Sequence, residues 1–520
     1  MIGFVVSEVG CRKVNALFHH RTLMMNYFNP RPDVYSQLNG VGGKQLYLLI
    51  GFALMSWHCM VWSQDAPVVS SQPWHPRDES SYRRQAEREP SLPMTSSRGS
   101  TYSLADLIDF AESHNPVTHA AWESARSRVE ALGVARSELY PMLVALALSQ
   151  TGRQEGYVGN RYYRQTLQSF NLGFDLNYTI VDFGGRSGRI NQAKEQLLAA
   201  DFEFNDTHRR VIYQVETAYY QLLNAMGQEE AARADVANAE AVKGAAEASL
   251  KNGLATLPDV LEARSSAAKA AYDLQAAIGS EDVARANLAV ALGTSPTVSI
   301  PVQSIEEIAD PKQVELSVDE MIDRAVQQRP DLLKQVAEIR AVDARVKEAK
   351  AAYFPSLQVH VYPDPQSLYG MQQQLPWGHT AALDGQISFN LRWTIFDGGA
   401  RKHALAEATR DARAAEAQAS ATRDEIENGV WVAYSNLKTA FRQREAAAAL
   451  LLSASQSYDA ALESYHYGVR NLLDVTEAQK TLAQARSADI LARAEVLSTL
   501  ADLTFQTADS IHSHNVRPQP

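Results

Sequence analysis

A change of hydrophobic period within one stretch is the strongest constraint on the fold of this chain. From Phe170 to Ile180 every second residue is apolar, and the residues between them are polar or glycine. That alternation predicts a strand with one apolar and one wet face. After Gly184 and Gly185 the alternation stops, and an Ala-, Glu-, Gln- and Leu-rich stretch runs without proline to Pro258. The sequence therefore predicts a strand joined directly to a helix of about sixty residues.

The same unit occurs twice in the chain. The stretch "YTIVDFGGR" at 178–186 recurs as "WTIFDGGAR" at 393–401, an offset of 215 residues. The same offset relates "NGLATLPDVLEA" at 252–263 to "YGVRNLLDVTEA" at 467–478. Further upstream the halves match at an offset of 214, so a single-residue length change separates them in the hairpin region. An internal duplication of this kind predicts that both halves fold alike.

Each half is predicted to contain the same order of elements. A short helix leads to a second helix that opens with Pro116 or Pro330, because proline suits the first helical position, and that helix ends near Pro141 or Pro355. Polar loops with glycine or proline join the strands of each pair. The predicted strands cover 142–153, 165–181, 356–362 and 386–396. The predicted short, long and returning helices cover 103–113, 186–250, 257–292, 317–327, 401–465 and 472–506.

Residues 1–63 are predicted to be an N-terminal extension with a signal peptide. Lys44 precedes an apolar core at 46–55, and cleavage is expected after Ser63. The alternative is a membrane anchor, but polar residues interrupt the apolar run before it reaches a comfortable spanning length. Cys11 and Cys59 are the only cysteines and both precede the cleavage site, as suits an exported protein without disulfides. The other predicted segments are a flexible Pro/Ser-rich linker (64–100), a first repeat (101–300), an inter-repeat linker (301–316), a second repeat (317–508) and a tail (509–520).

Charge and motif content argue against several classes of function. The formal net charge is −11 and no polybasic block occurs, which makes nucleic acid an unsuitable partner. The sequence contains no HExxH, GxSxG, GxxxxGK or paired-cysteine motif, so we predict no enzyme, catalytic residue, metal or cofactor. Downstream of the signal no apolar run is long enough for a spanning helix. If the mature protein enters a membrane, it does so with strands.

The four strands leave two arrangements open by themselves. Their apolar face can meet a second layer in a soluble domain or lipid in a membrane barrel. Four strands cannot close a barrel, and open edges in lipid leave backbone groups unsatisfied. Three copies would supply twelve strands, and the Ala-rich helices would continue them as a second cylinder. An isolated fibrous coiled coil is the other reading of the helices, but it does not account for the strands.

Over 103–506 the chain resembles the TolC-type outer-membrane efflux protein family. The resemblance rests on the duplicated turns and on the duplicated strand-to-helix junctions at Asp182, Gly184, Gly185, Asp397, Gly398 and Gly399. It implies a mixed α/β membrane protein: a homotrimer with a twelve-stranded barrel, four strands per chain, continued by a long helical barrel and built from two tandem repeats. It also implies a location in the outer membrane of a Gram-negative bacterium, with the helices in the periplasm. The barrel alone would anchor the chain in outer-membrane lipid, because no suitable lipid-attachment cysteine is present.

The implied function is the exit duct of a tripartite efflux pump or a type I secretion system. Its implied partners are a periplasmic adaptor protein and an inner-membrane pump. Residues that match the adaptor-docking turns are Gly253, Leu257, Asp259, Val260, Gly468, Leu472, Asp474 and Val475. For Asp259, helix capping alone is an equally good reading, since an aspartate suits the positive end of a helix. The alternative function is a structural or adhesive envelope protein that uses the helices as a periplasmic spacer, and the sequence does not name a cargo.

The resemblance also implies a gate at the periplasmic entrance, formed by Tyr467, Arg470, Asp474 and Glu477. Asp474 and Glu477 are three residues apart and share a helix face. Three copies would form an acidic ring that favours cations and opens when pairs with Arg470 break. The first turn has Ala255 where the second has Arg470, so the latch is expected to differ between the halves.

Overall fold

The fold is described by a computed structural model. It describes residues 79–86, 101–158, 160–298, 300–303, 305, 317–372 and 376–509, and the chain divides into a unit of residues 1–90 and a unit of residues 91–520. The predicted signal peptide, both cysteines and most of the inter-repeat linker lie outside the described residues. In the first unit, the exposed helix α3 (Glu79–Ala86) lies within the segment 64–100 that is predicted to be a flexible linker. Its good helix formers and a hydrogen bond from Arg84 Nε to the Ser80 carbonyl (3.1 Å) stabilise this one short helix.

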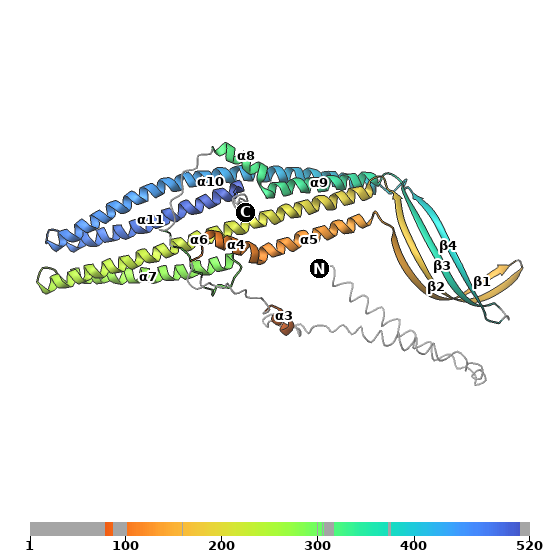
Figure 1. The fold of residues 1–520 in the computed structure, drawn as a ribbon, viewed down its shortest axis with the longest axis horizontal. Helices are drawn as coiled ribbons and strands as arrows, with labels where there is room; N and C mark the ends of the chain where they lie inside the picture. The colour runs from red at the N-terminus through yellow and green to blue at the C-terminus, as the bar shows by residue number, and fades with distance from the viewer. Residues whose placement is uncertain are drawn as a thin grey trace, which may run out of the picture. The chain divides into compact units, whose positions relative to one another are not determined.

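The second unit contains two copies of one helical arrangement (Figure 1). All six predicted helix ranges are confirmed to within one residue at each end. The long helices α6 and α10 each have 67 residues, which corresponds to about 100 Å of length. The first copy comprises α4 (Leu104–His114), α5 (Pro116–Ser137), α6 (Gly185–Lys251) and α7 (Leu257–Ala291). The second comprises α8 (Val318–Gln328), α9 (Pro330–Ala351), α10 (Ala400–His466) and α11 (Leu472–Thr507).

One antiparallel sheet holds the four described strands in the order β1-β2-β3-β4. The strands are longer than predicted, and most of both predicted loops is paired strand, so the loop predictions are wrong. The strands are β1 (Met142–Val158), β2 (Arg161–Val181), β3 (Ser356–Gln372) and β4 (Gly378–Arg392). Side-chain alternation weakens in these outer parts, but backbone hydrogen bonds do not depend on it and continue the ladder.

Two prolines explain how β3 continues through its predicted loop. Pro363 and Pro365 both pair with β4, whereas the β2–β3 ladder is interrupted between Gln366 and Val361. The missing proline N–H groups therefore fall on the side where the ladder is open. The strand β4 ends at Arg392 rather than at the predicted 396, because Arg392 pairs with Ser356, the first residue of β3, and the preceding Pro355 has no N–H to donate. The indole N–H of Trp393 donates to the Tyr353 carbonyl (3.1 Å).

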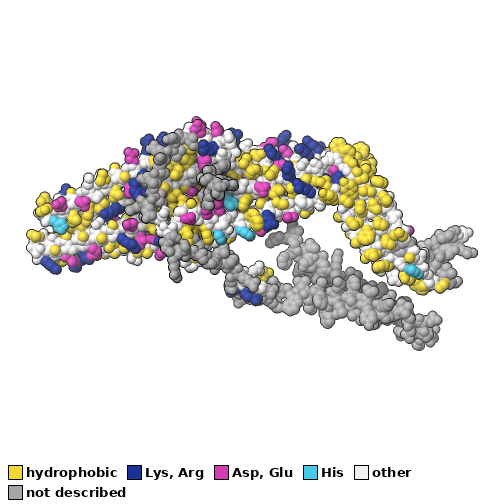
Figure 2. Space-filling view, viewed as in Figure 1, with side chains coloured by type: hydrophobic (Ala, Val, Ile, Leu, Met, Phe, Trp, Pro, Cys, Tyr) yellow, Lys and Arg dark blue, Asp and Glu magenta, His cyan; other side chains and the backbone are white. Residues whose placement is uncertain are grey.

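The register gives the sheet one apolar and one mainly polar face. Matching rows on the apolar face are Leu176, Val361 and Ile387, then Tyr178, Val359 and Phe389. Phe389 is 68% exposed, and hydrophobic side chains dominate the sheet in Figure 2. The opposite face carries Asn177, His360 and Ser388 in one row, and His360 Nε2 contacts Asp175 Oδ1 at 2.8 Å. Strand β1 departs from this pattern, because it places Val144 and Leu146 on the polar face, opposite Asp175 and Gly173.

The described helices contain three buried apolar clusters. One joins α4 and α7 to the middle of α6, and a second, at the matching place in the other repeat, joins α8 and α9 to α10 and α11. The third lies at the ends of α6, α7, α10 and α11. Helix α6 packs against α4, α5, α7, α9 and α11 and so connects the two repeats. None of the helices in the described ranges combines the length and apolar character needed to cross a membrane.

Candidate functional site

Each strand-to-helix junction is built around one aspartate. Asp182 Oδ2 accepts a hydrogen bond from the Arg186 backbone N–H (2.5 Å), and Asp397 Oδ2 accepts one from the Arg401 backbone N–H (3.1 Å). Each arginine side chain returns to its aspartate, at 3.6 Å in the first junction and 2.7 Å in the second. Hydrogen bonds from Arg401 hold the pKa of Asp397 below its usual value. These contacts satisfy free N–H groups at the helix start, which is a capping role.

Glycine supplies the backbone conformation that this cap requires. Gly184 and Gly399 precede the helices with φ of 105° and 92°, in the left-handed region that favours glycine. The second junction has another left-handed glycine, Gly398 (φ 66°), where the first has Phe183 (φ 53°). The Phe183 ring stacks on Phe354 with centroids 5.4 Å apart, and this contact fixes the unusual backbone. In the first junction Gly185 is helical, and an added Cβ there would lie 3.0 Å from Asp182 Oδ2.

At the far ends of the long helices, opposite the sheet in Figure 1, lie two turns. We call residues 252–256 the first turn and residues 467–471 the second turn. Gly253 and Gly468 have φ of 73° and 71° and allow the chain to reverse. In the first turn, the backbone N–H and hydroxyl of Thr256 donate to Asp259 Oδ2 at 2.8 and 2.7 Å, which lowers the pKa of Asp259. The Asp259 carboxylate is therefore engaged in capping α7.

The second turn is capped differently and leaves its aspartate available. Asn471 Oδ1 accepts a hydrogen bond from the Asp474 backbone N–H (2.9 Å), so an amide replaces the carboxylate as the cap. Within the described part of the chain, the Asp474 carboxylate has no hydrogen-bond or ion-pair partner. Glu477 lies 3.6 Å from Lys480 Nζ, and no ion pair joins it to Arg470 among the described residues. A latch of the expected kind would therefore have to form between copies.

Burial divides the predicted turn residues into two groups. Val260, Leu472 and Val475 are buried in the apolar cluster at the helix ends, so they shape the turns from inside. Leu257 and Tyr467 are exposed, as a docking surface requires. The structure adds exposed apolar residues that the sequence analysis missed: Leu254 (82% exposed), Val469 (78%) and Leu473. The sequence could have indicated these positions, because Leu254 and Val469 directly follow the two turn glycines and Leu473 follows the first residue of α11.

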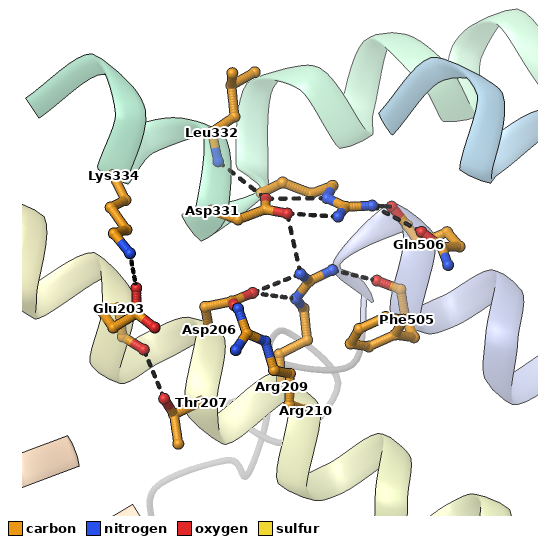
Figure 3. Close-up of polar contacts among 11 residues, drawn as sticks. Glu203, Asp206, Thr207, Arg209, Arg210, Asp331, Leu332, Lys334, Phe505 and Gln506 are labelled. Atoms are coloured by element: carbon orange, nitrogen blue, oxygen red, sulfur yellow. Dashed lines mark hydrogen bonds and ion pairs between the residues drawn. The ribbon is translucent and has the colours of Figure 1, made fainter. Parts of the chain in front are cut away.

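A buried charge cluster joins the two repeats near the middle of the helices (Figure 3). Arg209 of α6 is only 1% exposed and donates to Asp206 Oδ1 (2.5 and 3.0 Å) and to the Phe505 carbonyl of α11 (2.8 Å). Its guanidinium also lies 3.4 Å from Asp331 Oδ2, at the start of α9, and 4.2 Å from the centre of the Phe505 ring. Arg329 binds Asp331 (2.5 Å) and Gln506 Oε1 (2.8 Å). We call Asp206, Arg209, Arg329 and Asp331 the inter-repeat charge cluster.

The charges in this cluster compensate one another. Burial disfavours ionisation of Asp331, but hydrogen bonds from Arg329 and the charges of both arginines hold its pKa below the usual value. Burial and the nearby Arg329 lower the pKa of Arg209. Removing one partner of a buried charge that is paired and hydrogen-bonded in this way strongly destabilises the folded protein. The cluster has no repeated signal in the sequence, because the matching positions of the other repeat hold Ala421, Asp424, Asn115 and Val117.

Comparison with known proteins decides the family. The chain matches the family described as "Outer membrane efflux protein" over residues 107–294 and 321–508, one match for each repeat. The chain belongs to the outer membrane efflux protein family. Its members are homotrimeric outer-membrane channels that work with efflux or secretion machinery, and they are not enzymes. The expected family, channel function and outer-membrane location are thereby confirmed.

Relatives within this family are distant in sequence. Protein CyaE of Bordetella pertussis is 25% identical over 394 residues, covering 76% of this chain and 81% of that protein. The pyoverdine export outer membrane protein OpmQ of Pseudomonas aeruginosa is 25% identical over 362 residues, covering 66% of this chain and 70% of that protein. The solved structure of the outer-membrane channel OprN is 20% identical, with a TM-score of 0.69, and the match covers 78% of this chain and 89% of that chain. The likeness to the OprN structure supports the trimeric barrel-and-tunnel fold of the family.

Proposed function

We propose that this efflux-family channel receives its cargo from a periplasmic adaptor and an inner-membrane pump at its two helical turns. The observation that carries this proposal is the exposure of Leu254, Val469 and Leu473 around two turns whose bases are rigidly packed. Exposed apolar residues on a preformed surface favour protein docking. The turn glycines, Leu257, the capping residue Asp259 and the exposed Asp474 would support this docking surface, and Val260, Leu472 and Val475 would set its shape from beneath.

At the opposite end we propose that the apolar face of the sheet contacts outer-membrane lipid. Support comes from the row of Tyr178, Val359 and Phe389 and from the exposed side chains of Trp393 and Ile395 just beyond β4. Trp and other aromatic residues are typical of the edges of an apolar band in membrane barrels. The polar face, with Asp175 and His360, would then line the water-filled interior.

The cargo class follows from the pump, and two classes fit the family. The relative OpmQ is named for the export of pyoverdine. For this chain we propose a passive duct that serves either small-molecule efflux or type I protein secretion. Loss of the gene is expected to increase sensitivity to dyes, detergents or antibiotics, or to abolish the export of one secreted protein.

Docking can be tested by placing a charge on the turns. Leu254→Asp combined with Leu473→Asp should abolish capture of the purified adaptor encoded in the same genome, while the trimer survives in detergent. Leu452→Asp is the control, because Leu452 is also exposed but lies on α10 away from the turns. Equal adaptor capture by the wild type and the double variant would contradict docking at the turns.

The proposed gate at Tyr467, Arg470, Asp474 and Glu477 can be tested by conductance. Asp474→Ala with Glu477→Ala should raise single-channel conductance in planar bilayers, because it removes the acidic partners of Arg470 in the latch. It should also weaken the preference for cations, because it removes an acidic ring at the entrance. The matched control changes Asp259 and Glu262, which occupy the same positions in the first turn. Asp259 is engaged by Thr256, so this control should change the currents much less. Unchanged currents in the Asp474 and Glu477 variant would remove both residues from the gate.

A further inference from the structure

An open pocket lies where the sheet meets the helices, and we call it the junction pocket. Its volume is about 320 Å³, which is within the range of small-molecule sites. The side chains from the strands belong to the polar face of the sheet, because Thr179 pairs with Gln358 and Ser356 pairs with Arg392. The polar residues that line it and concern its charge are Thr179, Asp182, Arg189, Glu348, Gln358, Arg392 and Thr394.

The carboxylates at this pocket are already engaged. Glu348 Oε1 lies 3.1 Å from Arg189 Nη1, and the same guanidinium binds Glu138 Oε2 at 2.6 Å. Asp182 accepts from the Arg186 backbone N–H and lies beside the Arg186 side chain. These acids and arginines therefore neutralise one another and leave little charge for a ligand.

Arg392 is the exception among the charged residues of the pocket. It is exposed, and no hydrogen bond or ion pair engages its guanidinium within the residues that the structure describes. The first repeat has Asn177 at the matching position, and Asn177 Nδ2 donates to Asp175 Oδ1 at 2.6 Å. Thr394 and its match Thr179 both line the pocket. The duplication thus keeps the hydroxyl in both repeats and has a free cation only in the second.

The neighbouring copy in the trimer adds no counter-charge where β1 begins. Strands β1 and β4 are the two edges of the sheet, so a barrel of three copies closes by pairing β4 of one copy with β1 of the next. From its start to Gly152, β1 presents no acid on the polar face, whatever the register. The residues on that face are Met142, Val144, Leu146, Leu148, Gln150 and Gly152.

The first four of these β1 residues form an apolar wall. Met142 is 59% exposed and Leu148 is 52% exposed in the single chain, although both lie on the polar face of the sheet. Together with Arg392 they make a surface on which a cation lies close to apolar side chains. Such a surface matches a molecule that carries both an anionic group and an apolar body.

We infer that the junction pocket binds a carboxylate or another oxyanion of small organic cargo with an apolar body. The planar guanidinium of Arg392 would bind the oxyanion with two parallel N–H groups. The Thr179 and Thr394 hydroxyls and the Gln358 amide are further donors in the pocket. The inference rests on the proposed duct and names amphiphilic organic anions as its cargo class. Three copies give three such pockets around the base of the barrel.

Binding of naphthoate to the full-length trimer tests this inference. The trimer is placed in phosphatidylcholine nanodiscs, and retained naphthoate is measured by equilibrium dialysis against empty nanodiscs. The wild type should retain naphthoate, and Arg392→Gln should weaken its affinity by about tenfold, since a charge-assisted bidentate contact is lost. Lys402→Gln is the control, because Lys402 is exposed near the start of α10 but does not line the pocket. It should leave the affinity unchanged.

Matched ligands test the two parts of the site separately. Naphthamide has the same ring system without the charge, and acetate has the charge without the rings. Both should bind at least about tenfold more weakly than naphthoate. Equal affinity for naphthamide would overturn the role of the cation, and equal affinity for acetate would overturn the apolar wall.

A lipid headgroup shares the oxyanion chemistry and is a second possible source of the ligand. Nanodiscs that contain phosphatidylglycerol distinguish it from dissolved cargo. Naphthoate binding should be the same with and without this lipid, because the polar face is the proposed lumen. Loss of naphthoate binding in its presence would show that a lipid phosphate occupies the site, and would overturn the cargo assignment.

The outcomes separate this inference from the proposed function. No naphthoate binding by the wild type, or equal binding by Arg392→Gln, would overturn the pocket and leave the duct intact, provided that the protein forms conducting trimers in planar bilayers. If the wild type forms no conducting trimer, the inference and the proposed duct fall together. If Arg392→Gln does not assemble, Arg392→Lys decides. It keeps the charge without the planar fork, so weaker binding supports the site and unchanged binding contradicts it.

Discussion

The start of α5 and the start of α9 occupy matching places in the two repeats, but they are held by different chemistry. At α5, neutral Asn115 accepts from the Val117 N–H (2.8 Å) and donates to the Ala291 carbonyl (2.9 Å). At α9, Arg329 donates to the matching Gln506 carbonyl (3.3 Å) and binds Asp331. The backbone contact is the same, and charge has been added only in the second repeat. The duplication therefore preserves geometry while each copy adjusts its polar partners.

The largest effect should come from breaking the inter-repeat charge cluster. Asp331→Ala leaves Arg329 and the buried Arg209 short of a counter-charge, so the free energy of unfolding should fall by about 3–5 kcal/mol. The matching change in the first repeat is Val117→Ala, which removes an exposed side chain and should cost less than about 1 kcal/mol in the isolated chain. Urea unfolding followed by circular dichroism measures both.

A small loss for Asp331→Ala would mean that water, rather than the protein, solvates Arg209. A variant that changes Asp206, Arg209, Arg329 and Asp331 together to apolar residues sharpens the test. Replacing a whole buried charge group by apolar residues is often neutral or stabilising. If this fourfold variant is as unstable as Asp331→Ala, the stability depends on the charges themselves and not on the penalty of an unpaired one.

This comparison also explains what the sequence can and cannot predict. The helix ranges and the junctions at Asp182 and Asp397 were predictable, because they depend on local signals: a change of period, proline at a helix start and glycine at a turn. The charge cluster was not, since its contacts join residues 122 and 296 positions apart. The outer halves of the strands were missed because cross-strand backbone pairing, which has no local signature, forms them.

The turn residues show the same limit. Glycines 253 and 468 were recognised from the pattern, and their positive φ angles agree with it. Burial of Val260 and Val475 depends on α6 packing against α7 and on the two helix pairs meeting at their ends. The sequence match could not separate side chains that face outward from those that fill the turn, because both kinds are apolar.

A second difference between the repeats concerns an acid on α6. Burial raises the pKa of Glu216 to about 7, and its Oε2 atom has no hydrogen-bond partner among the described residues. The matching position on α10 is Trp431, which is half exposed. Burial of Tyr220, with the nearby charge of Glu216, also raises the pKa of Tyr220. The first repeat thus carries a titrating group that the second lacks.

The pH dependence of Glu216 has a defined sign. Between pH 4.5 and about 7 the unfolded chain loses this proton while the folded chain keeps it, so stability falls as pH rises and is constant above pH 7. Glu216→Gln should therefore stabilise the protein by about 3 kcal/mol at pH 8 and change little at pH 4. Melting temperatures of both proteins across pH 4 to 9 measure this difference. A Glu216→Gln effect that is independent of pH would contradict ionisation as its cause.

The smallest effect separates the helix ends that follow α7 and α11. Gly293 (φ 74°) and Ala508 (φ 62°) occupy matching left-handed positions, but only the first is glycine. A Cβ on Gly293 would lie 2.8 Å from Pro116 Cδ and 3.0 Å from Asn115 Cα, so Gly293→Ala should destabilise the protein by about 1–2 kcal/mol. Ala508→Gly relieves the left-handed backbone and should stabilise it by about 0.5–1 kcal/mol, less the added entropy of the unfolded chain. In thermal unfolding, Gly293→Ala should lower the melting temperature and Ala508→Gly should raise it. Shifts in the same direction would show that the two helix ends do not share one backbone requirement.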